Sequence, residues 1–418
     1  MKKIEVEFRG WGQQWHLGTL ADIGQGPIFE YSAEAVRRGI ELSPLRLPLG
    51  TQAHVGLPGL VEDALPDGWG MLLMDRVFRK HGLQPETLSP LDRLSFIGER
   101  AMGALAFRPA ALLELDARDY SLLELGRAAA EVFEDGDLDT LKTLAIIGGS
   151  PHGARPKALV QLEPATGRIS THPEAPGQPW LVKFPARGEH KEVCAIEAAY
   201  AQLARLCGID MPDSRHFDLG CDLAAFGVAR FDRVDGMRVP VLSAAGALHA
   251  DFRLPSLDYQ ALLRATRFFT RDEQEVRKAF ARCVFNVVFH NRDDHAKNFA
   301  FRMDRRFEWK LSPAYDLTFS SGPAGWHQTS VMGEARAPSR TDLDKLAADS
   351  GLPRAFAAQC IEQACEQAAQ LGPLLADAGV RKATREKVVA AVSQCVKRCA
   401  ARAWKTAGRL RRTSGRKV

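Results

Sequence analysis

Short apolar runs separated by polar or glycine-rich breaks make up the first part of the chain. Apolar and polar residues alternate within these runs, which is typical of half-buried β-strands, and Met71–Arg79 has the apolar spacing of a helix. We predict strands at Lys3–Arg9, His16–Asp22, Pro27–Tyr31 and Gly103–Phe107. These elements indicate an α+β module over residues 1–110. The Leu-, Ala- and Glu-rich stretch 112–133 predicts a helical connection over residues 111–140.

A second β-rich stretch is predicted over residues 141–240. Leu144–Ile147 and Ala158–Leu162 are apolar runs on either side of the glycine-rich segment 148–157, which therefore should join two strands. A Walker loop would instead open a helix, so this pattern favours a flap over phosphates. Phe226–Phe231 predicts a further strand, placed where a hinge between two lobes would pass a nucleotide base.

One strand and one helix of this stretch carry a pair of opposite charges. Trp180–Phe184 predicts a strand that contains Lys183, and Glu192–Leu206 has the periodicity of a helix with Glu197 in its first half. A strand lysine held by a helix glutamate is how kinases direct an ammonium group at the α- and β-phosphates. Either residue alone would mean little, and their position between flap and C-terminal lobe gives them weight.

From about residue 255 the apolar positions recur at helical spacing. The predicted helices are Tyr259–Phe269, Asp272–Phe289, Thr341–Asp349, Arg354–Leu371 and Thr384–Ala403. A β-rich lobe followed by a larger helical lobe is the bilobal order of protein-kinase-like folds. We therefore expect an α+β protein with a kinase N-lobe over 141–240, a mainly helical C-lobe over 241–405 and a basic tail over 406–418.

Composition narrows the class of protein. With 418 residues, of which 45% are hydrophobic and 26% charged, the chain is typical of a soluble protein of two or three domains. No apolar run approaches the length of a membrane span, acidic residues interrupt the start of the chain where a signal peptide would need an apolar core, and the eight cysteines include no Cys-x-x-Cys pair. We expect a cytoplasmic protein with no membrane partner.

Charge is unevenly distributed although the net charge is only +5. After Glu386 the chain has ten Lys and Arg residues and no acidic residue. Such a tail can neutralise nucleic-acid phosphates, or it can be a solubilising terminus, and both interpretations stay open.

The segment from His290 onward carries the candidate chemistry. Asp293 stands five positions before Asn298, the spacing by which a kinase catalytic loop presents a carboxylate to the acceptor hydroxyl and an amide oxygen to a metal. Phe299–Met303 and Phe307–Leu311 flank a polar turn and predict a β-hairpin, which would bring Asp316 back as a second metal ligand. Asp294, taken alone, is typical of a solvated or capping residue in a turn.

Several ordered motifs resemble the HipA-type serine/threonine kinases, which are toxins of bacterial toxin–antitoxin pairs. Ser150–Lys157 resembles the family's Ser-x-x-Gly-x-x-x-Lys loop, Arg230–Arg233 its Arg-Phe-Asp-Arg, and Asp293–Phe299 its Asp-x-His-x-Lys-Asn-Phe segment. Family-like stretches also occur in the first module, at Leu42–Leu49, Leu65–Gly68 and Ile97–Leu105. The resemblance extends from near residue 1 to about residue 400.

The resemblance implies specific roles. Asp293 would orient or deprotonate the acceptor hydroxyl with Lys297 also in catalysis, Asn298 and Asp316 would hold Mg²⁺, and Ser150 would be an autophosphorylation site whose phosphate shuts the enzyme off. The residues expected to bind ATP are Gly153, Lys157, Lys183, Glu197, Phe231, His295 and Tyr315. Many relatives have an acidic residue before Arg-Phe-Asp-Arg, where this chain has Ala229, which leaves backbone contacts for adenine.

The resemblance also implies partners. These are a small helix-turn-helix antitoxin of the HipB type, operator DNA reached through that antitoxin, and a protein substrate for which an aminoacyl-tRNA synthetase is the family example. Two alternatives stay open beside the kinase toxin: a weakly active or silent module that acts as a DNA co-repressor with its partner, and a stand-alone kinase of the same fold. The intact set of Asp293, Asn298, Asp316 and Lys183 argues against a silent enzyme.

Overall fold

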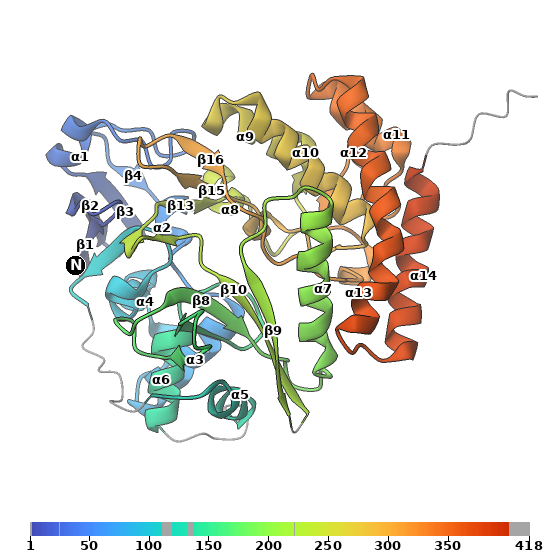
Figure 1. The fold of residues 1–418 in the computed structure, drawn as a ribbon. Coiled ribbons are helices and arrows are strands. Elements are labelled where there is room, and N and C mark those ends of the chain that lie inside the picture. The colour runs from blue at the N-terminus through green and yellow to red at the C-terminus, as the bar shows by residue number, and fades with distance from the viewer. Residues whose placement is uncertain (1, 25, 111–118, 132–137, 221, 401–418) are drawn as a thin grey trace, which may run out of the picture.

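The computed structural model describes residues 2–24, 26–110, 119–131, 138–220 and 222–400. Figure 1 shows the N-terminal strands at one end of the molecule, the C-terminal helices at the other, and a second sheet with helix α7 between them. The predicted basic tail 406–418 lies outside the described residues. The domain boundaries given above stay predictions.

A five-stranded antiparallel sheet in the order β4-β3-β2-β1-β5 forms the centre of the N-terminal module. In β1 the side chains of Ile4, Val6 and Phe8 are buried at alternate positions, as the period of a strand requires. The predicted strands are confirmed, with ends shifted by one or two residues. The elements are β1 Lys2–Phe8, β2 Trp15–Asp22, β3 Pro27–Tyr31, α1 Ala33–Arg38, β4 His54–Val55, α2 Gly59–Glu62, α3 Gly68–Lys80, α4 Pro90–Ile97 and β5 Leu105–Arg108.

The second sheet is also antiparallel, in the order β7-β6-β8-β10-β9, and α7 packs against β9 and β10. Lys183 ends β8, and Glu197 lies in the second turn of α7, both as predicted. The elements are α5 Leu122–Glu131, α6 Leu138–Gly148, β6 Lys157–Leu162, β7 Ile169–Ser170, β8 Gln178–Lys183, α7 Glu192–Leu206, β9 Ser214–Gly220 and β10 Leu223–Ala229.

One prediction in this region is corrected and another is confirmed in part. Leu144–Ile147 is the end of helix α6 and not a strand, so the glycine-rich flap joins a helix to β6. The run is too short to distinguish the two on periodicity, and it forms a helix because Leu141, Leu144 and Ala145 pack at helical spacing toward α3. The helix predicted over 112–133 is observed only at α5, while 112–118 and 132–133 lie outside the described residues.

The C-terminal lobe is mainly helical, with α10 at its centre against α9, α12 and α14. The predicted hairpin is confirmed, since β15 and β16 pair antiparallel with Phe301 opposite Leu311, and a third strand, β13, pairs with β15. The remaining elements are β11 Arg233–Val234, β12 Met237–Arg238, β13 Val241–Ser243, α8 Ala244–Leu248, β14 Leu257–Asp258, α9 Tyr259–Thr270, α10 Glu273–Val288, β15 Ala300–Met303, β16 Trp309–Leu311, β17 Thr329–Ser330, α11 Arg340–Asp349, α12 Arg354–Gln367, α13 Leu371–Asp377 and α14 Lys382–Cys399.

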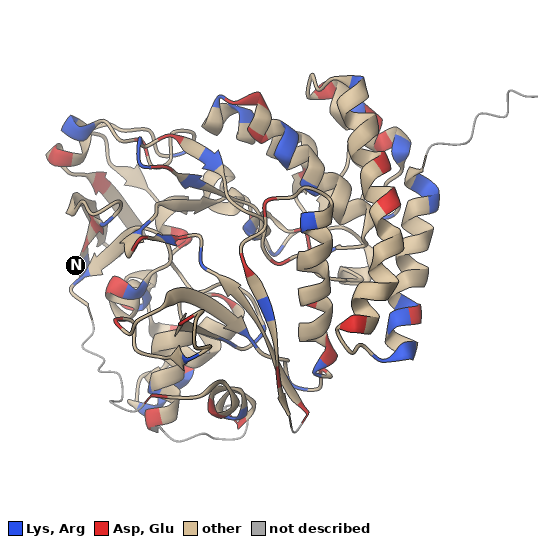
Figure 2. Ribbon diagram, in the orientation of Figure 1, with Lys and Arg blue, Asp and Glu red and all other residues tan. Residues whose placement is uncertain are grey.

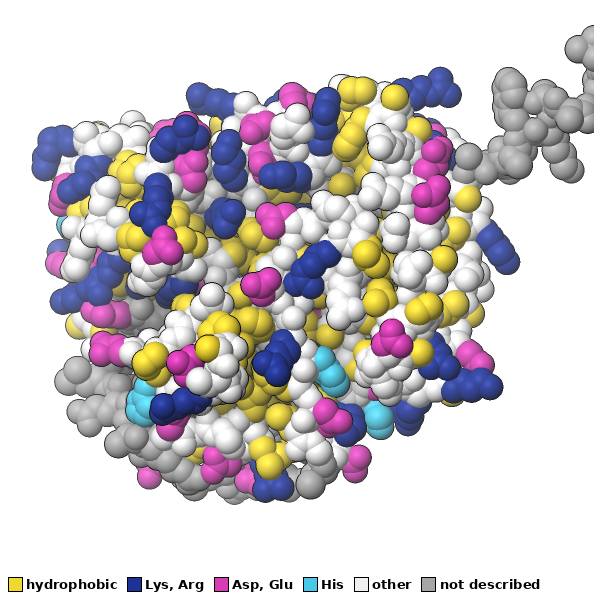
Figure 3. Space-filling model, in the orientation of Figure 1, with side chains coloured by type: hydrophobic (Ala, Val, Ile, Leu, Met, Phe, Trp, Pro, Cys, Tyr) yellow, Lys and Arg dark blue, Asp and Glu magenta, His cyan; other side chains and the backbone are white. Residues whose placement is uncertain are grey.

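Charges of both signs are interspersed over the molecule. Figure 2 shows acidic and basic residues together on the C-terminal helices, and the face drawn in Figure 3 carries both kinds of side chain over both lobes. No helix within the described ranges is both long and apolar enough to span a bilayer.

Candidate functional site

Lys183 is the centre of a buried charge cluster between the two lobes. Its Nζ donates to Glu197 Oε1 over 2.6 Å and also contacts Asp316 Oδ1. Burial alone would lower the pKa of Lys183, but the two carboxylates outweigh it and hold that pKa above its ordinary value. The hairpin β15–β16 brings Asp316 here as predicted, and Asp316 adopts the left-handed backbone region with φ 54°.

Asp293 and Asn298 lie side by side in the loop after α10. Asn298 Nδ2 donates to the backbone carbonyl of Asp293 over 2.6 Å, which leaves its amide oxygen as the atom available to a cation. The Asp293 side chain is 50% exposed, so a substrate group can reach it. Partial burial raises the pKa of Asp293, and this effect outweighs that of the nearby His295, which lowers it. The structure therefore brings Asp293 and Asn298 together, while the role of each residue stays a prediction.

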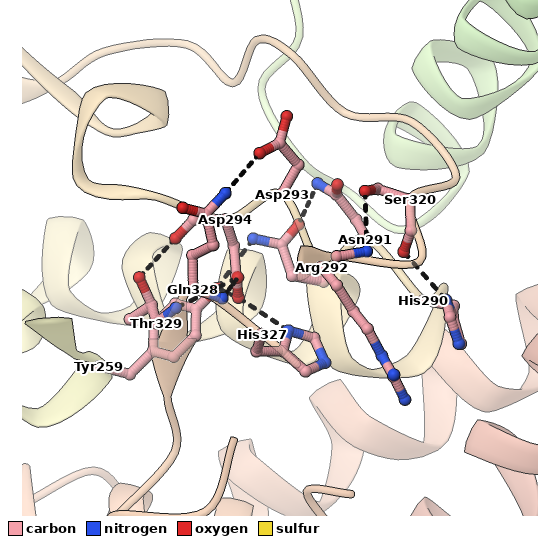
Figure 4. A network of polar contacts seen from close by, with 12 residues as sticks. Tyr259, His290, Asn291, Arg292, Asp293, Asp294, Ser320, His327, Gln328 and Thr329 are labelled. Carbon is pink, nitrogen blue, oxygen red and sulfur yellow. Dashed lines mark hydrogen bonds and ion pairs between the residues drawn. The ribbon is translucent and has the colours of Figure 1, made fainter. Parts of the chain in front are cut away.

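Asp294 is not the solvated turn residue that its sequence setting suggested. Its side chain is fully buried and accepts hydrogen bonds from the Tyr259 hydroxyl and His327 Nδ1, each over 2.9 Å, and from the backbone of Gln328 over 2.8 Å (Figure 4). Asp294 therefore anchors the segment 327–329 to the catalytic loop. Sequence reasoning missed this because its partners are 33 to 35 residues away on either side.

A pocket between the lobes has an apolar end and a polar end. Phe231 and Tyr315 lie with ring centroids 5.5 Å apart, and the Tyr315 hydroxyl donates to the backbone carbonyl of Lys297 over 2.6 Å. The lining includes Leu181, Val228, Ala229, Phe231 and Tyr315 on the apolar side and Lys183, His295, Asn298 and Asp316 on the polar side. An apolar end beside charged and amide side chains suits a ligand that has a flat ring at one end and negative charge at the other.

The glycine-rich flap covers this pocket. Gly153 lines it together with His152, and Lys157 reaches back beneath the loop to contact the backbone carbonyl of His152. A side chain at Gly153 would meet Lys157 Nζ at 2.5 Å, and its φ of +105° also favours glycine. Burial lowers the pKa of Lys157 to about 8.

Ser150 lies away from the pocket. Its side chain is 4% exposed, and its hydroxyl is buried with no hydrogen-bond partner in the described part of the chain. Met74, Arg100 and Ala145 line the small cavity beside it. The hydroxyl is therefore not accessible in this conformation, and the role of Ser150 as an autophosphorylation site stays a prediction.

Lys297 does not point at Asp293. Its Nζ lies 3.0 Å from Asp67 Oδ2 in the N-terminal module and 4.1 Å from the ring centroid of Phe252. The other oxygen of Asp67 accepts a hydrogen bond from the backbone of Gly153, so one carboxylate holds both the flap and the catalytic loop. Sequence reasoning missed Asp67, although it stands inside the quoted stretch Leu65–Gly68, because a residue before a helix is ordinarily read as an N-cap.

The N-terminal module also forms part of the pocket wall. Leu60, Asp63, Ala64 and residues 102–105 line the pocket together with the kinase lobes. Asp232 of the Arg-Phe-Asp-Arg motif is buried and accepts from the backbone of Gly103 over 2.9 Å, and Arg238 donates to the carbonyls of Gly103 and Leu105 over 2.9 and 2.7 Å. This motif therefore joins the hinge between the lobes to the N-terminal module.

Comparison with known proteins identifies the domains and the fold. The model of the HipA-like C-terminal domain matches residues 149–371, and that of the HipA N-terminal domain matches residues 10–108. The solved HipA of Shewanella oneidensis MR-1, in a complex with HipB and its operator DNA, has a TM-score of 0.68 at 18% sequence identity and covers 94% of this chain and 96% of that chain. This likeness establishes the bilobal HipA-like fold.

One curated relative adds a sequence match. A Sinorhizobium fredii protein described as "Putative kinase Y4dM" is 26% identical over 204 residues, which are 44% of this chain and 49% of that protein. The match thus spans about half the length of the relative. Because the C-terminal model alone covers more than half of the 418 residues, the chain belongs to the HipA family.

Proposed function

We propose that this chain is an ATP- and Mg²⁺-dependent serine/threonine protein kinase and the toxin of a toxin–antitoxin pair. The observation that supports it most directly is the cluster of Lys183, Glu197 and Asp316 at the polar end of the pocket, beside the loop of Asp293 and Asn298. In phosphoryl transfer a protein mainly positions the reactants and neutralises charge, and these residue types suit that task.

The residues have separate tasks in this proposal. Phe231 and Tyr315 would hold the adenine, and Lys183, kept in place by Glu197, would bind the α- and β-phosphates, with Lys157, Gly153 and His295 around them. Asp293 would orient the acceptor hydroxyl and take its proton. Lys297 would fix the loop through Asp67 rather than touch the acceptor.

Asn298 and Asp316 fit a magnesium site. Both line the pocket and offer hard oxygen atoms, and Mg²⁺ in kinases is commonly held by one or two side chains together with substrate phosphates. Among the described residues, no group of three or more His, Cys, Asp or Glu is placed to hold a metal without other ligands. When bound, the ion would neutralise developing phosphate charge.

The proposed partners follow from the family. The Shewanella relative was solved with HipB and operator DNA, so a HipB-like helix-turn-helix antitoxin and operator DNA are the partners we propose for this chain. We propose a translation protein such as an aminoacyl-tRNA synthetase as substrate. The buried Lys183–Glu197 pair disfavours the silent co-repressor, because such a module would have no need to keep an ammonium aimed into the pocket.

The direct test is phosphate transfer by the full chain and by Asp293→Ala. The wild-type chain, purified after expression, is expected to carry phosphate on Ser150 and to arrest growth, whereas Asp293→Ala should do neither and should still bind Mg²⁺·ATP. Loss of a positioned base costs about 10²–10⁴-fold in rate. Peptide mass spectrometry measures the phosphate on Ser150, and calorimetry measures the binding of Mg²⁺·ATP. Equal phosphate on the two proteins would exclude Asp293 as the base and the modification as the chain's own.

A further inference from the structure

Gln328 reaches the candidate base from a segment that carries no sequence motif. Its Nε2 donates to Asp293 Oδ1 over 2.7 Å, and Figure 4 shows the Asp293 carboxylate turned away from the buried Asp294 cluster and toward this amide. Half of the Asp293 side chain stays exposed, so a substrate group can reach the carboxylate. A neutral amide that donates to a carboxylate fixes its rotation without changing its charge.

The backbone at Gln328 is held in place from both sides. His327 and Thr329 turn inward to Asp294, the former through Nδ1 and the latter through its backbone and hydroxyl, while Gln328 points outward. This alternation is that of a strand, and β17 begins at Thr329 and pairs with β14. The hydrogen bond to Asp293 therefore belongs to a built arrangement and is not the chance contact of a loose loop.

Gln328 and Asp293 meet outside the lining of the pocket between the lobes. Asn298 and Asp316 line that pocket, whereas Asp293 and Gln328 are not part of its lining. The acceptor must meet the γ-phosphate from the opposite side, since attacking and leaving oxygens lie roughly in line. Gln328 thus stands where the acceptor hydroxyl arrives.

We propose that Gln328 is a positioning residue on the acceptor side, which holds one oxygen of Asp293 so that the other faces the acceptor hydroxyl. This inference rests on the proposed kinase function. In that reaction the hydroxyl oxygen bonds to the γ-phosphorus, the bond from that phosphorus to the β–γ bridging oxygen breaks, the hydroxyl proton passes to the free oxygen of Asp293, and ADP leaves.

Two substitutions distinguish the hydrogen bond of Gln328 from the space that its side chain fills. Gln328→Met keeps the length of the side chain but removes the donor, and Gln328→Glu keeps the shape but places a second carboxylate against Asp293. Gln161→Met is the matched control, because Gln161 Nε2 also donates over 2.8 Å, but to the backbone carbonyl of Pro173 in an exposed setting. The acceptor is the inactive Asp293→Ala chain, incubated with Mg²⁺·ATP and each active variant, and transferred phosphate is measured by intact mass.

We expect Gln328→Met to lower kcat about 10- to 150-fold, which is the loss expected for a hydrogen bond to a charged group. Gln328→Glu should lower kcat further, and both should leave the KM for ATP and the unfolding temperature within error of the Gln161→Met control. A merely structural role would affect KM and unfolding together with kcat and would leave the isosteric Gln328→Glu near wild type.

Four results would overturn the inference. An unchanged kcat in Gln328→Met removes the positioning role, and a higher kcat would mean that the amide holds Asp293 out of action. Parallel losses of ATP affinity, thermal stability and kcat would make Gln328 structural. If the wild-type chain transfers no phosphate, the proposed kinase function itself fails and the inference fails with it, a result distinct from an active wild type beside an unaffected Gln328→Met.

Discussion

Replacing Asp67 by alanine should release the flap from the catalytic loop. The Asp67 side chain is 11% exposed and that of Lys297 6%, and their charged atoms are 3.0 Å apart. Removing one partner of a buried pair costs about 3–5 kcal/mol. The cation–π contact between Lys297 Nζ and the Phe252 ring, 4.1 Å apart, remains in the variant. It offsets about 0.5–2 kcal/mol of the cost of leaving the ammonium without its carboxylate. The net loss should be on the order of 3 kcal/mol, with the hydrogen bond to Gly153 lost in addition.

The affinity for the nucleotide should fall with this loss, because the flap lines the pocket. If about 1.4 kcal/mol of the lost free energy destabilises the conformation in which the flap covers the pocket, Mg²⁺·ATP should bind about tenfold more weakly. Asp67→Asn keeps an acceptor for Gly153 but loses the charge, so its effect should be smaller. Calorimetry gives the dissociation constants, and thermal unfolding gives the accompanying change in stability.

Asp75→Ala is the matched control for this experiment. Asp75 lies in α3, the helix that begins directly after Asp67, and pairs with Arg93 over 2.6 Å instead of with the flap. We expect Asp75→Ala to affect stability without a matching loss of ATP affinity. An Asp67→Ala chain that binds Mg²⁺·ATP as tightly as wild type, or no more weakly than Asp75→Ala, would refute the link between Asp67 and the flap.

Two further predictions concern the same pocket. Asp316→Ala should weaken binding of Mg²⁺·ATP by at least about tenfold while metal-free ATP is less affected, because a metal ligand is lost; equal affinities for Mg²⁺·ATP in variant and wild type would place the metal elsewhere. Burial lowers the pKa of His152 to about 4, so as the pH falls from about 6.5 toward 4 the released flap takes up a proton that the seated flap does not. Seating of the flap should therefore weaken in this range, as measured by hydrogen exchange over 149–157, and His152→Asn should flatten the dependence; an unchanged pH dependence in that variant would exclude His152 as its source.

Local patterns predicted much of this molecule. The alternation in β1, the hairpin after Asn298 and the placement of Lys183 and Glu197 each depend on residues close in sequence, where strand and helix periods act directly. Leu144–Ile147 failed because four apolar residues fit a strand and the end of a helix equally well, and packing against α3 decides between them.

Contacts between distant segments were beyond such patterns. Lys297 and Asp67 are 230 positions apart, and Asp293 and Gln328 are 35 apart. Lysine in a catalytic motif predicts chemistry, and only the folded chain shows that a carboxylate from another module holds it. Gln328 carries no local signal at all, since a lone glutamine in a loop is ordinary.

The contacts of Asp232 with Gly103 mean that residues of the N-terminal module and of the kinase lobes together form the pocket proposed to bind the nucleotide. A shorter chain that began at residue 141 would lose the backbone N–H that Asp232 binds, the carbonyls that receive Arg238, the carboxylate opposite Lys297 and the wall formed by Leu60 and Ala64. Buried polar groups without hydrogen-bond partners destabilise the fold, so such a fragment would be less stable and its pocket would lack one wall. In the proposed function, a partner that separated the N-terminal module from the hinge would weaken nucleotide binding without entering the pocket.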